Sequence, residues 1–284
     1  MELVAPGRPS VFARTGDLPR TFVIGMLMLG VAIAVAFIGP FVLPQDPLAL
    51  NFAEALKPPS AAHWMGTDNF GRDVLTRIVY GASIDLQFGF FSVVPTFVIG
   101  TALGIFAGMY RRFDAVLMRL LDLVIAFPVY VLVIAIVAAL GPGVRNMYIA
   151  IYVIGWAAYA RVVRNEVLVV RSLPYIEAAR VLGFSPLRIF TRHVLPNVIV
   201  QPVVMATTNF VAWILLGSSL GFLGLGVQPP TPEWGVMIAE GRNFVVQAPW
   251  LSIFPGLAIF FVCCGAIFLG DGLADLLRPE VSRR

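Results

Sequence analysis

Long apolar runs alternate with short polar segments along this chain. Thr21 to Leu43 is the clearest run, because it contains no charged side chain over 23 residues. A transmembrane helix needs about 20 mostly apolar residues. On this basis we predict six spans, at 21–43, 86–109, 116–140, 147–160, 198–216 and 251–268. The fourth span is short, and we expect its helix to continue beyond the membrane through Arg161.

The polar connection at 44–84 is the longest one between two predicted spans. It contains Asp68, Arg72, Asp73 and Arg77, which are close enough in sequence to form ion pairs. The apolar residues after Asp73 recur at helical spacing, so we predict a short capped helix lying at the membrane surface. A metal site is the alternative use of these carboxylates, but no cluster of His, Cys and Asp accompanies them.

Several features inside the predicted spans guide their interpretation. The second span is rich in glycine, which favours close helix packing, and Pro95 interrupts it. In the third span, Arg119 and Asp122 have the i, i+3 spacing of an ion pair. After the fifth span, Gly and Pro are so dense over 217–235 that we expect a connection there without a long helix.

The polar stretch 161–197 carries six arginines between apolar segments, and we interpret it as two short helices joined at a glycine. Ser172 and Pro174 are typical of a helix start, and Glu177 lies in the first turn, where a carboxylate suits the positive helix end. Gly183 is typical of a helix stop. Ser185 and Pro186 start the second helix, and we expect Pro196 to end it.

Composition excludes most other classes of protein. The 284 residues are 59% hydrophobic and 13% charged, with a mean hydropathy of +0.87, which leaves too little polar surface to cover a soluble domain. The net charge of +4 is spread over several loops, so it does not favour nucleic-acid binding. The chain contains no GxxxxGK[ST] motif, and we therefore expect no ATP hydrolysis by a P-loop in this chain.

The distribution of Lys and Arg predicts the orientation in the membrane. If the N-terminus is cytoplasmic, 15 of the 20 basic residues fall on the cytoplasmic side, as the positive-inside rule requires. Both termini are then cytoplasmic, as tails at 1–20 and 277–284. The first span at 21–43 is followed by an extracytoplasmic connection at 44–84 and a five-helix core at 85–276. The stretch 161–197 faces the cytoplasm, and 228–249 faces the outside.

Several separated motifs resemble one family of transporters. Glu177-Ala178-Ala179, Gly183 and Leu195-Pro196-Asn197 look like the EAA loop of binding-protein-dependent ABC importer permeases. Gly66-Thr67-Asp68 and Gly71-Arg72-Asp73, with FLGLGVQPPTPEWG at 222–235, are similar to the dipeptide, oligopeptide and nickel branch. One departure is Gly217, where relatives in this branch commonly carry Glu.

The resemblance implies an all-α polytopic protein of the bacterial inner membrane with the type I importer permease fold. It implies a second homologous permease, two ATP-binding subunits and an extracytoplasmic binding protein as partners, with the segments 228–250 and 45–80 facing that protein. This chain would hold no cofactor, because ATP and Mg²⁺ are used by the partner subunits. The residues implied in coupling to the ATPase are Glu177, Ala178, Ala179, Arg180, Gly183 and Pro196.

Two other functions remain as alternatives from the residues alone. A secondary transporter driven by an ion gradient would need charges at mid-depth, yet the deepest predicted acids, Asp122 and Asp271, lie toward helix ends. A membrane enzyme lacks a catalytic group, because His63 and His193 are predicted on opposite sides. Candidates for the substrate pathway are the polar positions of the fifth span, which could equally be contacts between helices. These are Thr207, Thr208, Asn209 and Trp213.

Overall fold

The computed structural model describes residues 18–43 and 45–277, and the predicted tails lie almost wholly outside these ranges. Within them the chain is helical, with one isolated bridge between Thr67 and Asp73. The long helices are α1 (Arg20–Val42), α2 (Val74–Met109), α5 (Val144–Arg171), α9 (Val200–Phe222) and α11 (Trp250–Leu277). The shorter elements are η1 (Phe52–Glu54), α3 (Arg111–Ile125), α4 (Val129–Leu140), α6 (Pro174–Val181), α7 (Pro186–Ile189), η2 (Phe190–Val194), α8 (Leu195–Val198), α10 (Trp234–Gly241) and η3 (Arg242–Phe244).

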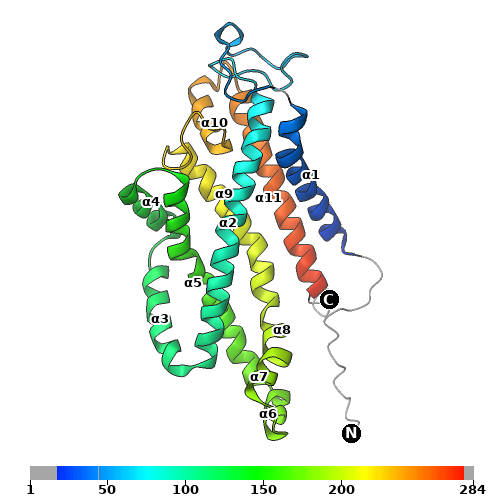
Figure 1. Cartoon of the computed structure of the whole chain (residues 1–284), viewed down its shortest axis with the longest axis vertical. Helices are drawn as coiled ribbons and strands as arrows, with labels where there is room; N and C mark the ends of the chain where they lie inside the picture. Colours follow the sequence, from blue (N-terminus) through cyan, green and yellow to red (C-terminus); the bar gives the residue numbers. More distant parts are fainter. Residues whose placement is uncertain (1–17, 44, 278–284) are drawn as a thin grey trace.

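The long helices form an elongated bundle whose two ends differ (Figure 1). The connection between α1 and α2 lies with α10 at one end, and α6 with α7 lies at the other. We call these the α10 end and the α6 end. Helices α1 and α11 run antiparallel in close contact, because a Cβ at Gly25 would lie 2.2 Å from the amide nitrogen of Leu269. The start of α1 and the end of α11 therefore lie on the same side, as the six-span topology requires.

The most extensive helix contact in the bundle is between α2 and α5, and glycines produce it. Gly100, Gly104 and Gly108 follow one another at i, i+4 and i+8 along α2. A Cβ at Gly100 would lie 2.4 Å from the carbonyl oxygen of Trp156, and one at Gly104 would lie 2.7 Å from that of Ala160. The backbones of α2 and α5 therefore approach as closely as small residues allow. The glycine-rich second span packs as predicted.

The third predicted span is not one helix. Helices α3 and α4 meet at an angle of 84°, with Pro128 immediately before α4. Proline lacks a backbone N–H and restricts the residue before it, so a helix reaching Phe127 cannot continue straight through. The structure thus has five helices suited to span a membrane among the described residues, or six if this bent pair is one span.

The predicted ion pair between Arg119 and Asp122 is wrong. Asp122 accepts a hydrogen bond from Nη2 of Arg161 on α5, at 2.7 Å, while the Arg119 side chain is exposed. Arg164, one turn further along α5, donates to both carboxylate oxygens of Asp114, at 2.8 and 2.6 Å. Two arginines of α5 therefore hold α3 by contacts between helices, which spacing within one helix cannot reveal.

Two predicted helix boundaries also change. The separate surface helix after Asp73 does not form, because the helix that begins at Val74 continues through the second span as one element of 36 residues. Asp73 caps it by accepting a hydrogen bond from the backbone N–H of Thr76 at 2.8 Å. Helix α9 extends to Phe222 through the glycine-rich segment. Gly217 therefore lies inside α9 and not in a loop. A Cβ at this position would be 2.4 Å from Cε1 of Phe88, so the packing of α9 against α2 favours a small residue here.

The most buried acid of the spans was not among those predicted. Asp85 of α2 lies inside the bundle near the α10 end and accepts a hydrogen bond from the backbone N–H of Trp234, at 3.2 Å. Glu233 caps α10 by accepting from the backbone N–H groups of Gly235 and Val236, at 2.7 and 2.8 Å. Burial raises the pKa of Glu233, although these two hydrogen bonds oppose that effect. The two carboxyls line one small cavity and connect α10 with α2.

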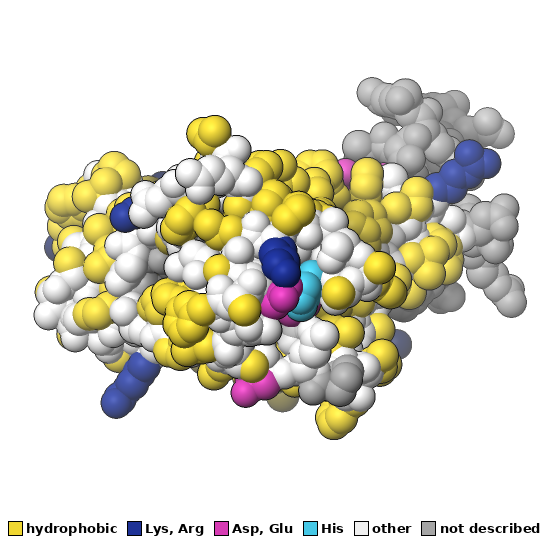
Figure 2. Space-filling view, turned by 90° about the horizontal axis from the view of Figure 1, so that it is seen from above, with side chains coloured by type: hydrophobic (Ala, Val, Ile, Leu, Met, Phe, Trp, Pro, Cys, Tyr) yellow, Lys and Arg dark blue, Asp and Glu magenta, His cyan; other side chains and the backbone are white. Residues whose placement is uncertain are grey.

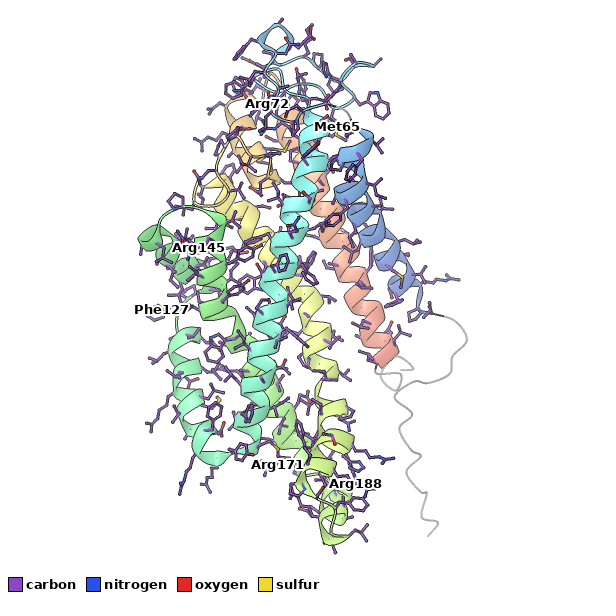
Figure 3. All side chains as sticks on the ribbon, viewed as in Figure 1. Met65, Arg72, Phe127, Arg145, Arg171 and Arg188 are labelled. Atoms are coloured by element: carbon purple, nitrogen blue, oxygen red, sulfur yellow. The ribbon has the colours of Figure 1, made fainter. Side chains whose placement is uncertain are left out.

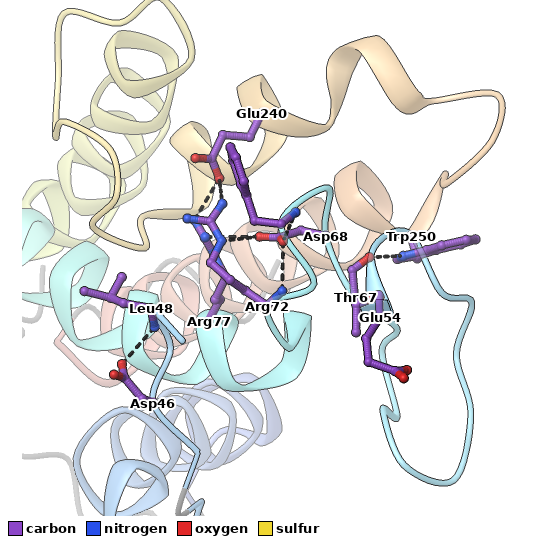
Figure 4. Close-up of polar contacts among 10 residues, drawn as sticks. Asp46, Leu48, Glu54, Thr67, Asp68, Arg72, Arg77, Glu240 and Trp250 are labelled. Carbon is purple, nitrogen blue, oxygen red and sulfur yellow. Dashed lines mark hydrogen bonds and ion pairs between the residues drawn. The ribbon is translucent and has the colours of Figure 1, made fainter. Parts of the chain in front are cut away.

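A cluster of four charged side chains fixes α10 to the start of α2, and we call it the charge cluster (Figure 4). Arg72 and Arg77 each bind Asp68, at 2.6 and 3.2 Å, and each binds Glu240 of α10, at 3.0 and 2.8 Å. The Arg77 side chain is 1% exposed and the Arg72 side chain 3%. The pairing of Asp68 with the two arginines matches the expectation, whereas Glu240, 163 residues from Arg77, could not be inferred. Asp73 pairs with His63 instead, at 2.9 Å.

Replacing Arg77 with Met should destabilise the protein strongly, because Asp68 and Glu240 would each lose one of their two cations in a buried site. Removing one partner of a buried ion pair costs about 3–5 kcal/mol. The matched control is Lys57→Met, since Lys57 pairs with Glu54 at the exposed surface. That change should cost at most about 1 kcal/mol. Thermal unfolding of each purified variant in detergent measures the two losses of stability. If both variants lowered the unfolding temperature equally, the charge cluster would not stabilise the protein more than a surface ion pair does.

Candidate coupling segment and translocation surface

The segment predicted to couple to an ATPase extends from the end of α5. Helix α5 continues without a break from Val144 to Arg171, so the fourth span does continue past Arg161 as expected. Ser172 then terminates α5, its hydroxyl donating to the carbonyl of Val169 at 2.9 Å, and does not cap α6 as predicted. Helix α6 begins at Pro174, with Glu177 in its first turn. Figure 1 shows α6 and α7 at the extreme tip of the α6 end.

Gly183 ends α6 in the way that the sequence predicted. Its φ of +76° lies in the left-handed region, which glycine adopts without steric cost. The N–H of Phe184 donates to the carbonyl of Ala179 at 3.1 Å, and the N–H of Gly183 donates to that of Arg180 at 3.0 Å. These two bonds define a Schellman motif. Ser185 then caps α7 by accepting from the N–H of Arg188 at 3.3 Å, so the chain reverses within a few residues.

The exposed face of α6 joins predicted residues with two that sequence reasoning missed. Glu177 and Ala178 are exposed, as are Val181 and Leu182, which follow one helical turn later. Val181 is 89% exposed and Leu182 is 72% exposed. Large apolar side chains this exposed at the tip of a helix are typical of a surface that another protein covers. Their i+3 and i+4 spacing from Ala178 places them on the same helix face, and this spacing could have identified them from the sequence.

The other predicted coupling residues occupy different places. Ala179 is buried against α5 and α7 together with Ile176, so it faces the protein interior. Arg180 lines a cavity beside α2. Pro196 does not end a helix as predicted, because it occupies the first turn of α8, where its missing N–H costs no hydrogen bond. The π-helical turn η2 precedes α8, and the chain continues through α8 into α9.

The four pathway candidates on α9 divide into two pairs. Trp213 is buried and its ring would contact a Cβ placed at Gly155 of α5, while Thr207 packs against Gly270 of α11. These two side chains therefore serve helix packing. Thr208 is exposed and Asn209 is partly exposed. Ala212, Leu215 and Ser219 continue the exposed side of Thr208 along the helix, so these residues form one exposed stripe of α9.

A bundle of long apolar helices with a small, exposed helix pair at one end is the architecture of a membrane-spanning subunit. Comparison with known proteins gives its class. Residues 100–283 match the family described as the binding-protein-dependent transport system inner membrane component. The chain belongs to this family, and it is a permease subunit of an ABC importer in the inner membrane.

Proteins of similar sequence agree with this assignment along most of their length. A dipeptide transport system permease of Alkalihalophilus pseudofirmus is 43% identical over 260 residues, which cover 91% of this chain and 86% of that protein. A glutathione transport system permease of Pectobacterium atrosepticum is 42% identical, covering 88% and 83%. Among solved structures, an inward-facing MetNI methionine ABC transporter aligns with a TM-score of 0.54 at 19% identity, over 70% of this chain and 95% of that one. It shares the fold. These findings do not favour the secondary transporter.

Replacing Gly183 with Val should destabilise the turn between α6 and α7 without unfolding the bundle. A left-handed conformation costs an L-residue roughly 1–2 kcal/mol, which lowers the population of the native turn by about 5- to 30-fold. Gly183→Asn is the matched control, since Asn tolerates this region far better than a β-branched residue. Limited proteolysis within 174–190 should accelerate in Gly183→Val alone. If both variants resisted proteolysis equally, the stability of the turn would not depend on the positive φ of residue 183.

Proposed function

We propose that this permease forms half of a translocation pathway for peptides or similar small solutes. The relatives named above as dipeptide and glutathione permeases support this substrate class, because they cover the chain almost completely. A binding protein would deliver the solute to the α10 end. Figure 2, a view onto that end, shows few charged side chains among many hydrophobic and uncharged ones. Exposed Trp64, Phe52 and Val246 belong to the segments expected to face the binding protein.

Energy for transport would come from two separate ATP-binding subunits, which use ATP and Mg²⁺, while this chain holds no cofactor. The observation that carries the coupling proposal is the α6 tip, which combines exposed Ala178, Val181 and Leu182 with a helix axis fixed by the Gly183 turn. Small Ala178 lets a partner approach closely, and the two apolar side chains supply area to bury. Arg180 flanks this face, and buried Ala179 packs behind it, whereas Pro196 lies further along the chain in α8.

Alternating access would follow from differential contact at this tip. If ATP closes the two ATPase subunits, the surface around α6 meets a different partner geometry in each state. Helix α5 leads from α6 to Val144, which lines the small cavity with Asp85 and Glu233, and it packs along α2 through the glycine contacts. The exposed stripe of α9 with Thr208 would face the solute. A second, homologous permease would supply the opposite wall.

The composition of the purified complex tests this proposal. We expect this chain to copurify with a second, different permease and with ATP-binding subunits, as quantified by mass spectrometry. Peptides should stimulate ATP hydrolysis in proteoliposomes when a binding protein is present. A complex holding two copies of this chain and no other permease would contradict the heteromeric assembly. Peptide uptake without any ATPase would contradict the energy source.

Replacing Ala178 with Glu should block docking, because a long charged side chain would enter the partner's surface. The structure places Ala178 outside the core, so the six spans should remain folded. We expect recovery of the ATPase to fall at least about tenfold, since burying an unpaired charge in an interface costs several kcal/mol. Ala178→Ser is the control of similar size and should assemble normally. If Ala178→Glu assembles and couples like the parent, α6 is not the docking helix.

A further inference from the structure

The small cavity that holds Asp85 and Glu233 lies where α2, α5, α9 and the start of α10 meet. Its volume is about 10 Å³, whereas a cavity needs roughly 10–15 Å³ to hold one water molecule. The two carboxyls therefore share a space with room for about one water at most. The other residues that line it are uncharged: Ile84, Phe88, Val144, Met147, Gly217 and Val227.

Close contacts of two glycines hold the start of α10 against α9 around these acids. A Cβ at Gly235 would lie 2.0 Å from the carbonyl oxygen of Ser218, and one at Gly221 would lie 2.1 Å from Oε2 of Glu233. Asp85 and Glu233 are each 3% exposed. Both carboxyls are thus enclosed by protein, where the local dielectric is low and repulsion between like charges is strong.

No cation within residues 18–43 and 45–277 forms an ion pair with either carboxyl. Arg77 of α2 pairs with Glu240 of α10 in the charge cluster, and Arg145 of α5 is exposed. Figure 3 shows Arg145 beside α4, with Arg72 well above it at the α10 end. If both acids were ionised, two buried like charges would therefore lie side by side without a counterion, which is strongly unfavourable.

The hydrogen bonds around the two acids are those of one carboxylate and one protonated carboxyl. Both oxygens of Glu233 accept from backbone N–H groups of α10, at 2.7 and 2.8 Å, which favours the ionised form. Asp85 accepts a single longer bond, from the N–H of Trp234 at 3.2 Å, and faces Glu233 within hydrogen-bonding reach. A proton on Asp85 would therefore be donated to Glu233.

The hydroxyl of Ser218 is a second sign of a shared charge at this place. Its oxygen is buried and has no hydrogen-bond partner in the described part of the chain, yet it lies beside both carboxyls. The Ser218 residue is 7% exposed, so water has little access to the hydroxyl. A hydroxyl has one proton to donate, so it can stabilise one carboxylate here but not two.

We propose that Asp85 and Glu233 bind one proton between them, and that this proton keeps the start of α10 on the bundle. With the proton bound, the two acids carry a single negative charge. Without it, the start of α10 moves away from α2 so that water reaches both carboxylates, while Glu240 stays paired in the charge cluster. A metal ion does not fit, because both oxygens of Glu233 already accept hydrogen bonds and the cavity is too small for hydrating water.

The proposal predicts that α10 docks less firmly as the pH rises. Burial raises the pKa of Glu233, so the docked state retains a proton that an exposed carboxyl, with a pKa near about 4, releases. Docking is then favoured in acid and weakens with rising pH, by at most about tenfold per pH unit for one proton. Because α10 belongs to the segment 228–250, external pH would act on the surface expected to face the binding protein. Only this last consequence rests on the proposed function.

Hydrogen exchange and infrared spectroscopy of the purified complex test the shared proton. Exchange of the amides 234–237, corrected for its intrinsic pH dependence, should accelerate from about pH 6 to pH 9 by up to about tenfold per pH unit. Asp85→Asn should remove this dependence and keep α10 protected, because Asn still accepts from Trp234 and donates an N–H to Glu233. The infrared C=O band of a protonated carboxyl, present in the parent near neutral pH, should decrease in Asp85→Asn.

The matched control is Asp46→Asn, since Asp46 is an exposed acid at the same end and should leave both measurements unchanged. Protection of 234–237 that is independent of pH in the parent would overturn the proposal, even if Asp85→Asn fails to assemble. So would an infrared band that survives Asp85→Asn unchanged, or recovery of protection at high pH by added Na⁺ or Mg²⁺. Neither measurement needs a solute, ATP or a binding protein, so the result is independent of the proposed function.

Discussion

Close contact between α2 and α5 is the constraint on which the rest of the architecture depends. Backbones that approach at Gly100 and Gly104 leave no room for a Cβ, so any larger residue would separate the two helices. Because α5 continues to Arg171 and α6 follows it within a few residues, this packing also determines where α6 lies. The α10 end and the α6 end are therefore positioned by one helix pair, with Asp114 and Asp122 attaching α3 to the same helix.

Local sequence patterns predicted the features that depend on neighbouring residues alone. The spans other than the bent third one, the Gly183 stop and the Ser185 cap all follow from composition or from backbone preferences within a few residues, and each was found in the structure. Ion pairs between residues far apart in the sequence were not predicted. Glu240 completes the charge cluster from 163 residues away, and Arg161 rather than Arg119 binds Asp122. Spacing within one helix carries no information about such contacts.

Glycine was the least reliable signal, because its two roles look alike in sequence. At Gly183 it permits a left-handed turn, whereas at Gly217 it allows Phe88 to pack against a continuing helix. The dense glycines after Leu216 therefore suggested a loop where α9 continues. Proline was ambiguous for a similar reason. Pro128 precedes a sharp bend, but Pro196 fits in the first turn of α8 and the chain remains helical.

The uninterrupted length of α5 has a mechanical consequence. A helix of 28 residues is about 42 Å long, so it acts as a lever arm between its two ends. Tilting such an arm by roughly 10° about its centre would displace each end by about 4 Å, in opposite directions. If α5 tilts in this way, a modest angular change at α6 would produce a movement of several ångströms at the other end of the helix. The length of α5 thus determines how far its ends would move for a given tilt.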